Sequence, residues 1–126
     1  MNQGEKKLVA TLVEAIQDKK GKEIVVADFK NIKNVVCNYF VICQANTRNQ
    51  IEAIARNIGE FTLKETNEKP FAVTGEENAI WIAIDYGNVM VHIFQPAARA
   101  FYDLEHLWAD AELTRIPDID AEQAAV

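Results

Sequence analysis

The chain has 126 residues, of which 49% are hydrophobic and 25% are charged, and this composition is typical of one globular domain. Its apolar runs are too short to span a membrane and its first residues lack the apolar core of a signal peptide, so we expect a cytoplasmic protein. The net charge of −6 arises in residues 103–126, where seven acidic side chains are balanced only by Arg115. This acidic end disfavours direct, sequence-specific nucleic-acid binding and favours a basic partner, although a role in solubility alone would also explain it.

The first half of the chain predicts two helices and two strands, over residues 5–20, 23–29, 39–43 and 48–64. Apolar side chains recur at helical spacing in the first and last of these segments, whereas the middle two are short and almost continuously apolar, which is typical of buried strands. Asn46-Thr47 provides a candidate N-cap for the second helix. Gly59 lies inside that helix, where it costs about 1 kcal/mol relative to Ala, and we expect a close contact with the sheet to require it.

The stretch from Ala79 to Phe94 predicts a β-hairpin, because two apolar runs flank Gly87-Asn88 and Gly accepts the positive φ of a tight turn. Pairing across this turn places one aliphatic set on one face, with Ile84 opposite Val91 and Ile82 opposite Ile93. The other face pairs Trp81 with Phe94, Ala83 with His92 and Asp85 with Met90. The first face is typical of a core, while the second is aromatic and contains two titratable groups.

A short strand over residues 70–74 precedes the hairpin, and Pro96 suits the first turn of a helix that runs to about Ala111 with an interruption near Asp103. We expect residues 1–113 to form a single domain and residues 114–126 a flexible acidic tail. The order of elements predicts an α/β fold, in which two amphipathic helices cover one face of a mixed five-stranded sheet. The third helix is expected at an edge or on the second face.

The sequence predicts no catalytic, cofactor or metal site. Cys37 and Cys43 are too far apart along an extended stretch to form a disulfide, and together with His92 and His106 they lack the close ligand spacing of a zinc site. Asp85 has no nearby acidic neighbour that would help to hold Mg²⁺, and it does not pair with His92 in the expected register. We therefore do not expect an enzyme.

Two segments of different predicted structure follow one another: WIAIDYGNVMVHIF from Trp81 to Phe94 and RAFYDLEHLW from Arg99 to Trp108. Together with YFVI at Tyr39–Ile42, they resemble the ribosomal silencing factor family, also called the Iojap family, and the resemblance extends from about Glu5 to Leu113. It implies a fold related to nucleotidyltransferases without their activity. It also implies binding to the large ribosomal subunit through its ribosomal protein fourteen, at the face where the small subunit docks, so that subunit joining is blocked and translation is repressed.

The hypothesis for the partner-binding surface combines the aromatic face of the hairpin with the segment that follows it. Aromatic side chains would form its centre, and Asp85 and Glu105 would meet Arg or Lys across the interface. The candidate residues are Trp81, Asp85, Tyr86, His92, Phe94, Tyr102, Leu104, Glu105, Leu107 and Trp108. In the opposing interpretation the last helix covers this face as ordinary core, with His92 hydrogen-bonded inside.

Two other functions remain open at this stage. A metal-dependent enzyme of nucleotidyltransferase type would show a thermal shift that depends on metal and nucleotide. A homodimerisation module would bury the aromatic face against a second copy, and sedimentation would then depend on concentration.

Overall fold

The computed structural model describes residues 3–32, 37–106 and 111–118. Its helices are α1 (Gln3–Asp18), α2 (Arg48–Thr66) and α3 (Pro96–Tyr102), followed by a 3-10 turn (Leu104–His106). Its strands are β1 (Lys22–Asp28), β2 (Tyr39–Gln44), β3 (Ala72–Thr74), β4 (Trp81–Asp85), β5 (Val89–Phe94) and β6 (Glu112–Ile116). Among these described residues, no helix is both long enough and apolar enough to cross a membrane.

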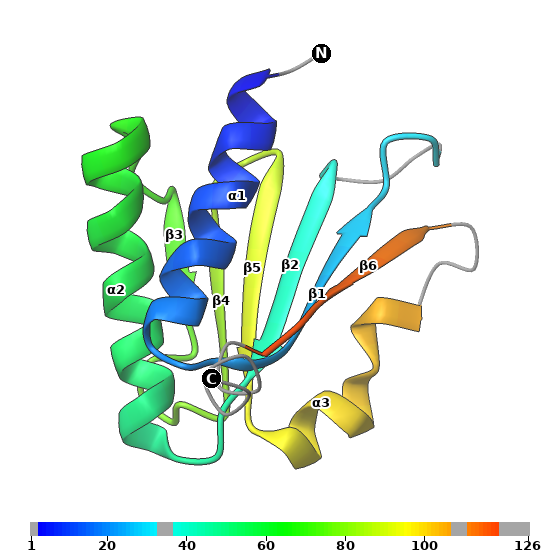
Figure 1. The fold of residues 1–126 in the computed structure, drawn as a ribbon. Coiled ribbons are helices and arrows are strands. Elements are labelled where there is room, and N and C mark those ends of the chain that lie inside the picture. Colours follow the sequence, from blue (N-terminus) through cyan, green and yellow to red (C-terminus); the bar gives the residue numbers. More distant parts are fainter. Residues whose placement is uncertain (1–2, 33–36, 107–110, 119–126) are drawn as a thin grey trace, which may run out of the picture.

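The strands form one mixed sheet in the order β3-β4-β5-β2-β1-β6, in which β2 and β5 are parallel and the other neighbours are antiparallel (Figure 1). The helices α1 and α2 cover one face, while side chains of α3 and the 3-10 turn pack on the other. This arrangement confirms the predicted α/β class with a mixed sheet and helices mainly on one face.

The predicted number of strands was wrong, because the described residues form a sheet of six strands and not five. The additional strand β6 pairs with the free edge of β1, placing Ile116 opposite Ile24 and Leu113 opposite Ala27. It crosses the expected boundary between residues 113 and 114. A strand with two apolar residues gives a weak local pattern, since its stability comes from the long-range partner. The end of the expected tail, residues 119–126, lies outside the described residues.

Each face of the sheet has its own core. Under α1 and α2, aliphatic side chains of both helices pack on those of the hairpin; the largest are Leu12, Ile16, Ile51, Ile54, Ile58, Ile82 and Ile93. Each of these contributes roughly 1.5–3 kcal/mol through burial. The second cluster is mainly aromatic and contains Phe29, Phe40 and Phe94, with Trp81, Met90 and Leu104 partly buried against it. The predicted division into an aliphatic and an aromatic face is therefore confirmed.

The hairpin has the predicted register, with all five expected pairs from Trp81–Phe94 to Asp85–Met90. The Tyr86 amide donates to the Val89 carbonyl at 2.9 Å and closes the two-residue turn. Gly87 occupies the first turn position at φ +89°, as a type II′ turn requires. The Asp85 carboxylate accepts a hydrogen bond from the Gly87 amide at 2.7 Å, and this contact stabilises the turn.

We expect Gly87→Ala to lower the free energy of unfolding by about 1–2 kcal/mol, because an L side chain is strained at positive φ. The new Cβ would also lie 3.0 Å from the Phe71 ring, which would have to shift. Urea denaturation measures this loss. Asn88→Ala at the other turn position is the control, and equal losses in both variants would contradict the argument.

The second helix begins as predicted, with the Thr47 hydroxyl accepting from the Gln50 amide at 3.1 Å. It ends at Asn67, whose left-handed conformation provides the C-cap. The expected reason for Gly59 was wrong, because a Cβ added there would meet nothing within 4 Å. No packing contact of the described residues therefore requires glycine at this position.

Gly59→Ala should consequently stabilise the domain, by about 0.5–1 kcal/mol, since alanine loses less conformational freedom in a helix. A higher midpoint in chemical denaturation would show it. A lower midpoint would contradict this argument, because it would mean that the added methyl group clashes with a neighbouring group.

Candidate docking surface

Trp81, on the outer face of β4, connects the buried aromatic cluster to the molecular surface. Its indole nitrogen donates to Nδ1 of His92 at 3.0 Å. Its ring stacks on Phe94 with a centroid distance of 4.9 Å and contacts the Tyr102 ring at 4.7 Å. The side chain is half-buried, so part of the ring is held in a fixed position at the surface.

His92 supports Trp81 from within the sheet and is only 4% exposed. Burial lowers the pKa of its imidazole from 6.5 to about 4, so the ring is neutral near pH 7. Because Nδ1 accepts the indole hydrogen bond, the proton lies on Nε2, and Nε2 has no hydrogen-bond partner in the part of the chain that the structure describes. The Phe40 ring packs edge-on against the imidazole at 4.5 Å. These contacts suit His92 to positioning Trp81.

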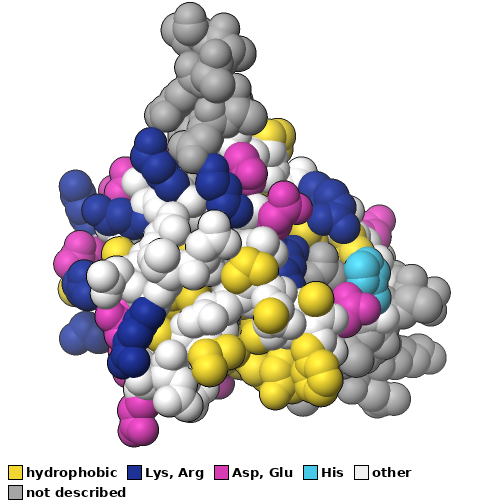
Figure 2. Space-filling view, turned by 90° about the horizontal axis from the view of Figure 1, so that it is seen from below, with side chains coloured by type: hydrophobic (Ala, Val, Ile, Leu, Met, Phe, Trp, Pro, Cys, Tyr) yellow, Lys and Arg dark blue, Asp and Glu magenta, His cyan; other side chains and the backbone are white. Residues whose placement is uncertain are grey.

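The exposed part of this surface comes from the end of α3. Phe101 is 81% exposed and Tyr102 is 47% exposed, and their rings meet edge to face at 5.0 Å. We call Trp81, Phe101 and Tyr102 the aromatic surface. Figure 2 shows hydrophobic side chains gathered on the underside of the molecule, beside a histidine and an acidic side chain. Large exposed aromatic groups in contact with one another are typical of a protein interface.

Asp103 follows the last residue of α3 and lies next to the aromatic surface. This residue is left-handed at φ 48°, and its amide donates to the Arg99 carbonyl. Its carboxylate lies 2.6 Å from Nδ1 of His106, and both side chains are more than half exposed. The predicted interruption of the last helix near Asp103 is thereby confirmed, and it places the hydrogen-bonded side chains of Asp103 and His106 beside the aromatic surface.

The structure brings some of the predicted site residues together and separates others. Phe94 is fully buried below Trp81, and Leu104 packs against the same aromatic cluster, so both support the surface without forming its exterior. Asp85 is half-buried at the far end of β4, where its carboxylate binds the turn. Asp85 lies opposite Met90, as the expected register predicted, and it is therefore not paired with His92.

Tyr86 lies on the other face of the sheet. It is 6% exposed, and its hydroxyl is 2.8 Å from the hydroxyl of Thr62, a buried residue of α2. Neighbouring residues of a strand alternate between faces, so Tyr86 follows Ile84 into the aliphatic core. Glu105 lies in the 3-10 turn, but its side chain is outside what the structure describes, as are Leu107 and Trp108.

The sequence-based hypothesis did not include Phe101 among the candidate residues, because its exposure depends on where α3 ends. The two cysteines, by contrast, belong to the interior, where burial raises the pKa of Cys37 to about 11 and that of Cys43 to about 12. The described residues also contain no group of three or more His, Cys, Asp or Glu side chains that could hold a metal ion.

The α/β domain presents aromatic side chains beside an acidic side chain, and this arrangement is typical of the class of domains that dock on other proteins. The sequence profile described as "Ribosomal silencing factor during starvation" matches residues 2–126, so the chain belongs to the ribosomal silencing factor family. This confirms the resemblance seen in the sequence. The family is one of ribosome-associated regulators that repress translation, and its members are named as factors and not as enzymes.

Individual relatives agree with this assignment over most of their length. The chain is 36% identical to "Ribosomal silencing factor RsfS" of Bacillus subtilis over 113 residues, which covers 90% of this chain and 92% of the relative. It is 34% identical to the protein of the same name from Halalkalibacterium halodurans, over 89% of this chain and 94% of the relative. A crystal structure of a protein from Bacillus halodurans superimposes with a TM-score of 0.74 at 32% identity, covering 88% of this chain and 99% of the other.

Proposed function

We propose that this protein binds the large ribosomal subunit in the cytoplasm, through ribosomal protein fourteen, at the face where the small subunit joins. Its presence there would block subunit association by steric exclusion and so repress translation. The observation that supports this most is the exposure of Phe101 and Tyr102, whose rings meet each other while the Tyr102 ring also contacts Trp81. Exposed aromatic anchors on a rigid support are the side chains that contribute most to protein interfaces.

Charge supports the same kind of partner. Asp103 is exposed at the rim of the aromatic surface, and the net charge of −6 arises in the C-terminal part of the chain. Acidic groups around an apolar centre increase the rate of encounter with a basic protein surface. They repel the phosphate backbone of nucleic acid, and this disfavours direct, sequence-specific nucleic-acid binding. The proposed partner contact is therefore with protein.

Co-sedimentation tests the proposal. The protein should pellet with isolated large subunits, and at saturation it should reduce the yield of whole ribosomes when small subunits are added. Mg²⁺ and nucleotide should leave its melting temperature unchanged, whereas the nucleotidyltransferase alternative requires a shift. Normal ribosome formation at saturation would refute steric exclusion, even if binding to the large subunit were observed.

The free protein offers a second candidate state, in which the aromatic surfaces of two copies cover each other. The observation that favours it is the 81% exposure of Phe101, which a dimer would reduce. Sedimentation velocity over a range of concentrations should then show a dimer that Phe101→Ala dissociates. A monomer at all concentrations would exclude this state without affecting ribosome binding.

A further inference from the structure

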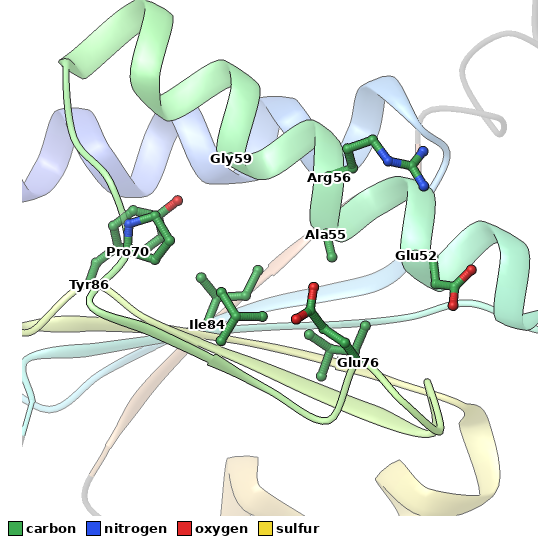
Figure 3. A pocket seen from close by; sticks show the side chains of 10 residues that line it. Glu52, Ala55, Arg56, Gly59, Pro70, Glu76, Ile84 and Tyr86 are labelled. Atoms are coloured by element: carbon green, nitrogen blue, oxygen red, sulfur yellow. The ribbon is translucent and has the colours of Figure 1, made fainter.

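A concave region lies away from the aromatic surface, between α2 and the β3–β4 segment. It is a cleft of about 450 Å³, within the range of roughly 300–1,000 Å³ that is typical of small-molecule sites. Figure 3 shows the helix above it and the strands below it. The lining residues that matter here are Glu52, Ala55, Arg56, Gly59, Pro70, Glu76 and Ile84.

The cleft exists because the helix residues above it have small side chains or none. The buried stripe of α2, with Ile51, Ile54 and Ile58, faces the main core. The adjacent stripe presents Ala55 and Gly59 to the cleft, and a Cβ at Gly59 would still meet open space. The helix and the strands therefore do not close on each other at this position. A glycine that no packing contact requires, inside a helix, is suited to the close approach of a ligand.

Both ends of the cleft are fixed by hydrogen bonds from α2. At one end Arg48 donates to the Glu77 carbonyl at 2.6 Å, which holds the turn after β3. At the other end the hydroxyls of Thr62 and Tyr86 are 2.8 Å apart. These contacts hold the helix and the strands at a set separation, and they suit the cleft to a short ligand more than to a polypeptide passing through it.

The chemistry of the walls indicates what kind of ligand would fit. Ala55, Pro70 and Ile84 supply an apolar surface. Figure 3 shows the Glu76 carboxylate directed into the cleft toward Ala55, with Glu52 at the same end and Arg56 projecting along α2. The Glu52 carboxylate also accepts from Arg48 at 3.1 Å, so the exposed Glu76 side chain is the carboxylate placed to meet a ligand in the cleft. Aliphatic walls beside such a carboxylate complement a cation on a hydrocarbon chain.

We propose that this cleft binds a free primary alkylamine, with the alkyl chain along Ala55 and Ile84 and the ammonium group at Glu76. The site uses no residue of the aromatic surface and lies on the other face of the sheet. The proposal therefore goes beyond the proposed ribosomal role, and failure of one would leave the other standing.

The test is an NMR titration of the whole chain with n-pentylamine, compared with n-pentanol and pentanoate at equal ionic strength. The amine should cause saturable shifts at the Ala55, Gly59 and Ile84 amides, and the alcohol and the acid should bind at least about tenfold more weakly. Glu76→Gln should weaken amine binding at least about fivefold. Glu60→Gln removes the same charge from an exposed position of α2 outside the cleft, and it should bind like the parent.

Gly59→Leu provides an independent check, because it adds a side chain directed into the open space without removing any charge. It should abolish the amine-dependent shifts while the melting temperature is maintained. Equal binding of amine and alcohol, or equal binding by Glu76→Gln and Glu60→Gln, would overturn the proposal. So would binding of a lysine-rich peptide in the absence of binding by the free amine, since the cleft would then be a protein-docking groove.

Discussion

The double variant Phe101→Ala/Tyr102→Ala is expected to bind isolated large ribosomal subunits roughly thirtyfold more weakly than the parent, or worse. Exposed aromatic anchors in an interface each contribute on the order of 1–2 kcal/mol or more, and tenfold in affinity corresponds to about 1.4 kcal/mol. Both side chains are exposed in the free protein, so their removal leaves the buried cores in place. Quantitative co-sedimentation at fixed salt measures the change.

Phe71→Ala is the matched control for that experiment. Phe71 is 79% exposed, about as much as Phe101, but it precedes β3 and lies near Gly87, at the opposite end of the β4–β5 hairpin from Trp81. It should leave binding unchanged within about twofold. If the double variant binds as well as Phe71→Ala does, the aromatic surface is not the ribosome contact.

Acidification should destabilise the fold through His92, by roughly 3 kcal/mol between pH 6.5 and pH 4. The pKa of the folded imidazole is lowered to about 4, whereas the unfolded chain titrates near 6.5. Below pH 6.5 the unfolded chain therefore takes up a proton that the folded chain does not accept. The stability is fully present above pH 6.5 and is lost as the pH falls toward 4. Urea denaturation across this range measures it.

His92→Gln isolates this effect from that of the carboxylates, which titrate in both proteins. A glutamine amide oxygen can still accept the Trp81 indole hydrogen bond, but it takes up no proton in this range. The difference in unfolding free energy between parent and variant should shrink as the pH falls. Parallel pH profiles for the two proteins would show that His92 is not buried in its neutral form.

The features that were predictable from the sequence are those set by local patterns. The hairpin register follows from strict alternation around Gly87, and the start of α2 follows from the Thr47 cap. Strand β6 was not predictable, because the segment from Glu112 to Ile116 forms a strand only by pairing with the edge of β1. The exposure of Phe101 depends likewise on where α3 ends, which its neighbours in space determine.

Long-range contacts also explain the amide side chain of Asn38. Its side-chain amide donates to both carboxylate oxygens of Glu5, at 3.1 and 2.9 Å. A carboxylate at position 38 would face the Glu5 carboxylate and repel it. The amide is therefore matched to a partner 33 residues earlier in the chain, and no local pattern could reveal this.

The pairing of β6 with β1 joins strands from opposite ends of the chain. A growing polypeptide can therefore complete its sheet only after residue 116 has been made, and until then β1 has an unpaired edge. Such an edge is a template for association with other chains. Chains cut short before residue 112 should consequently aggregate, and degradation of incomplete products would protect the cell from them.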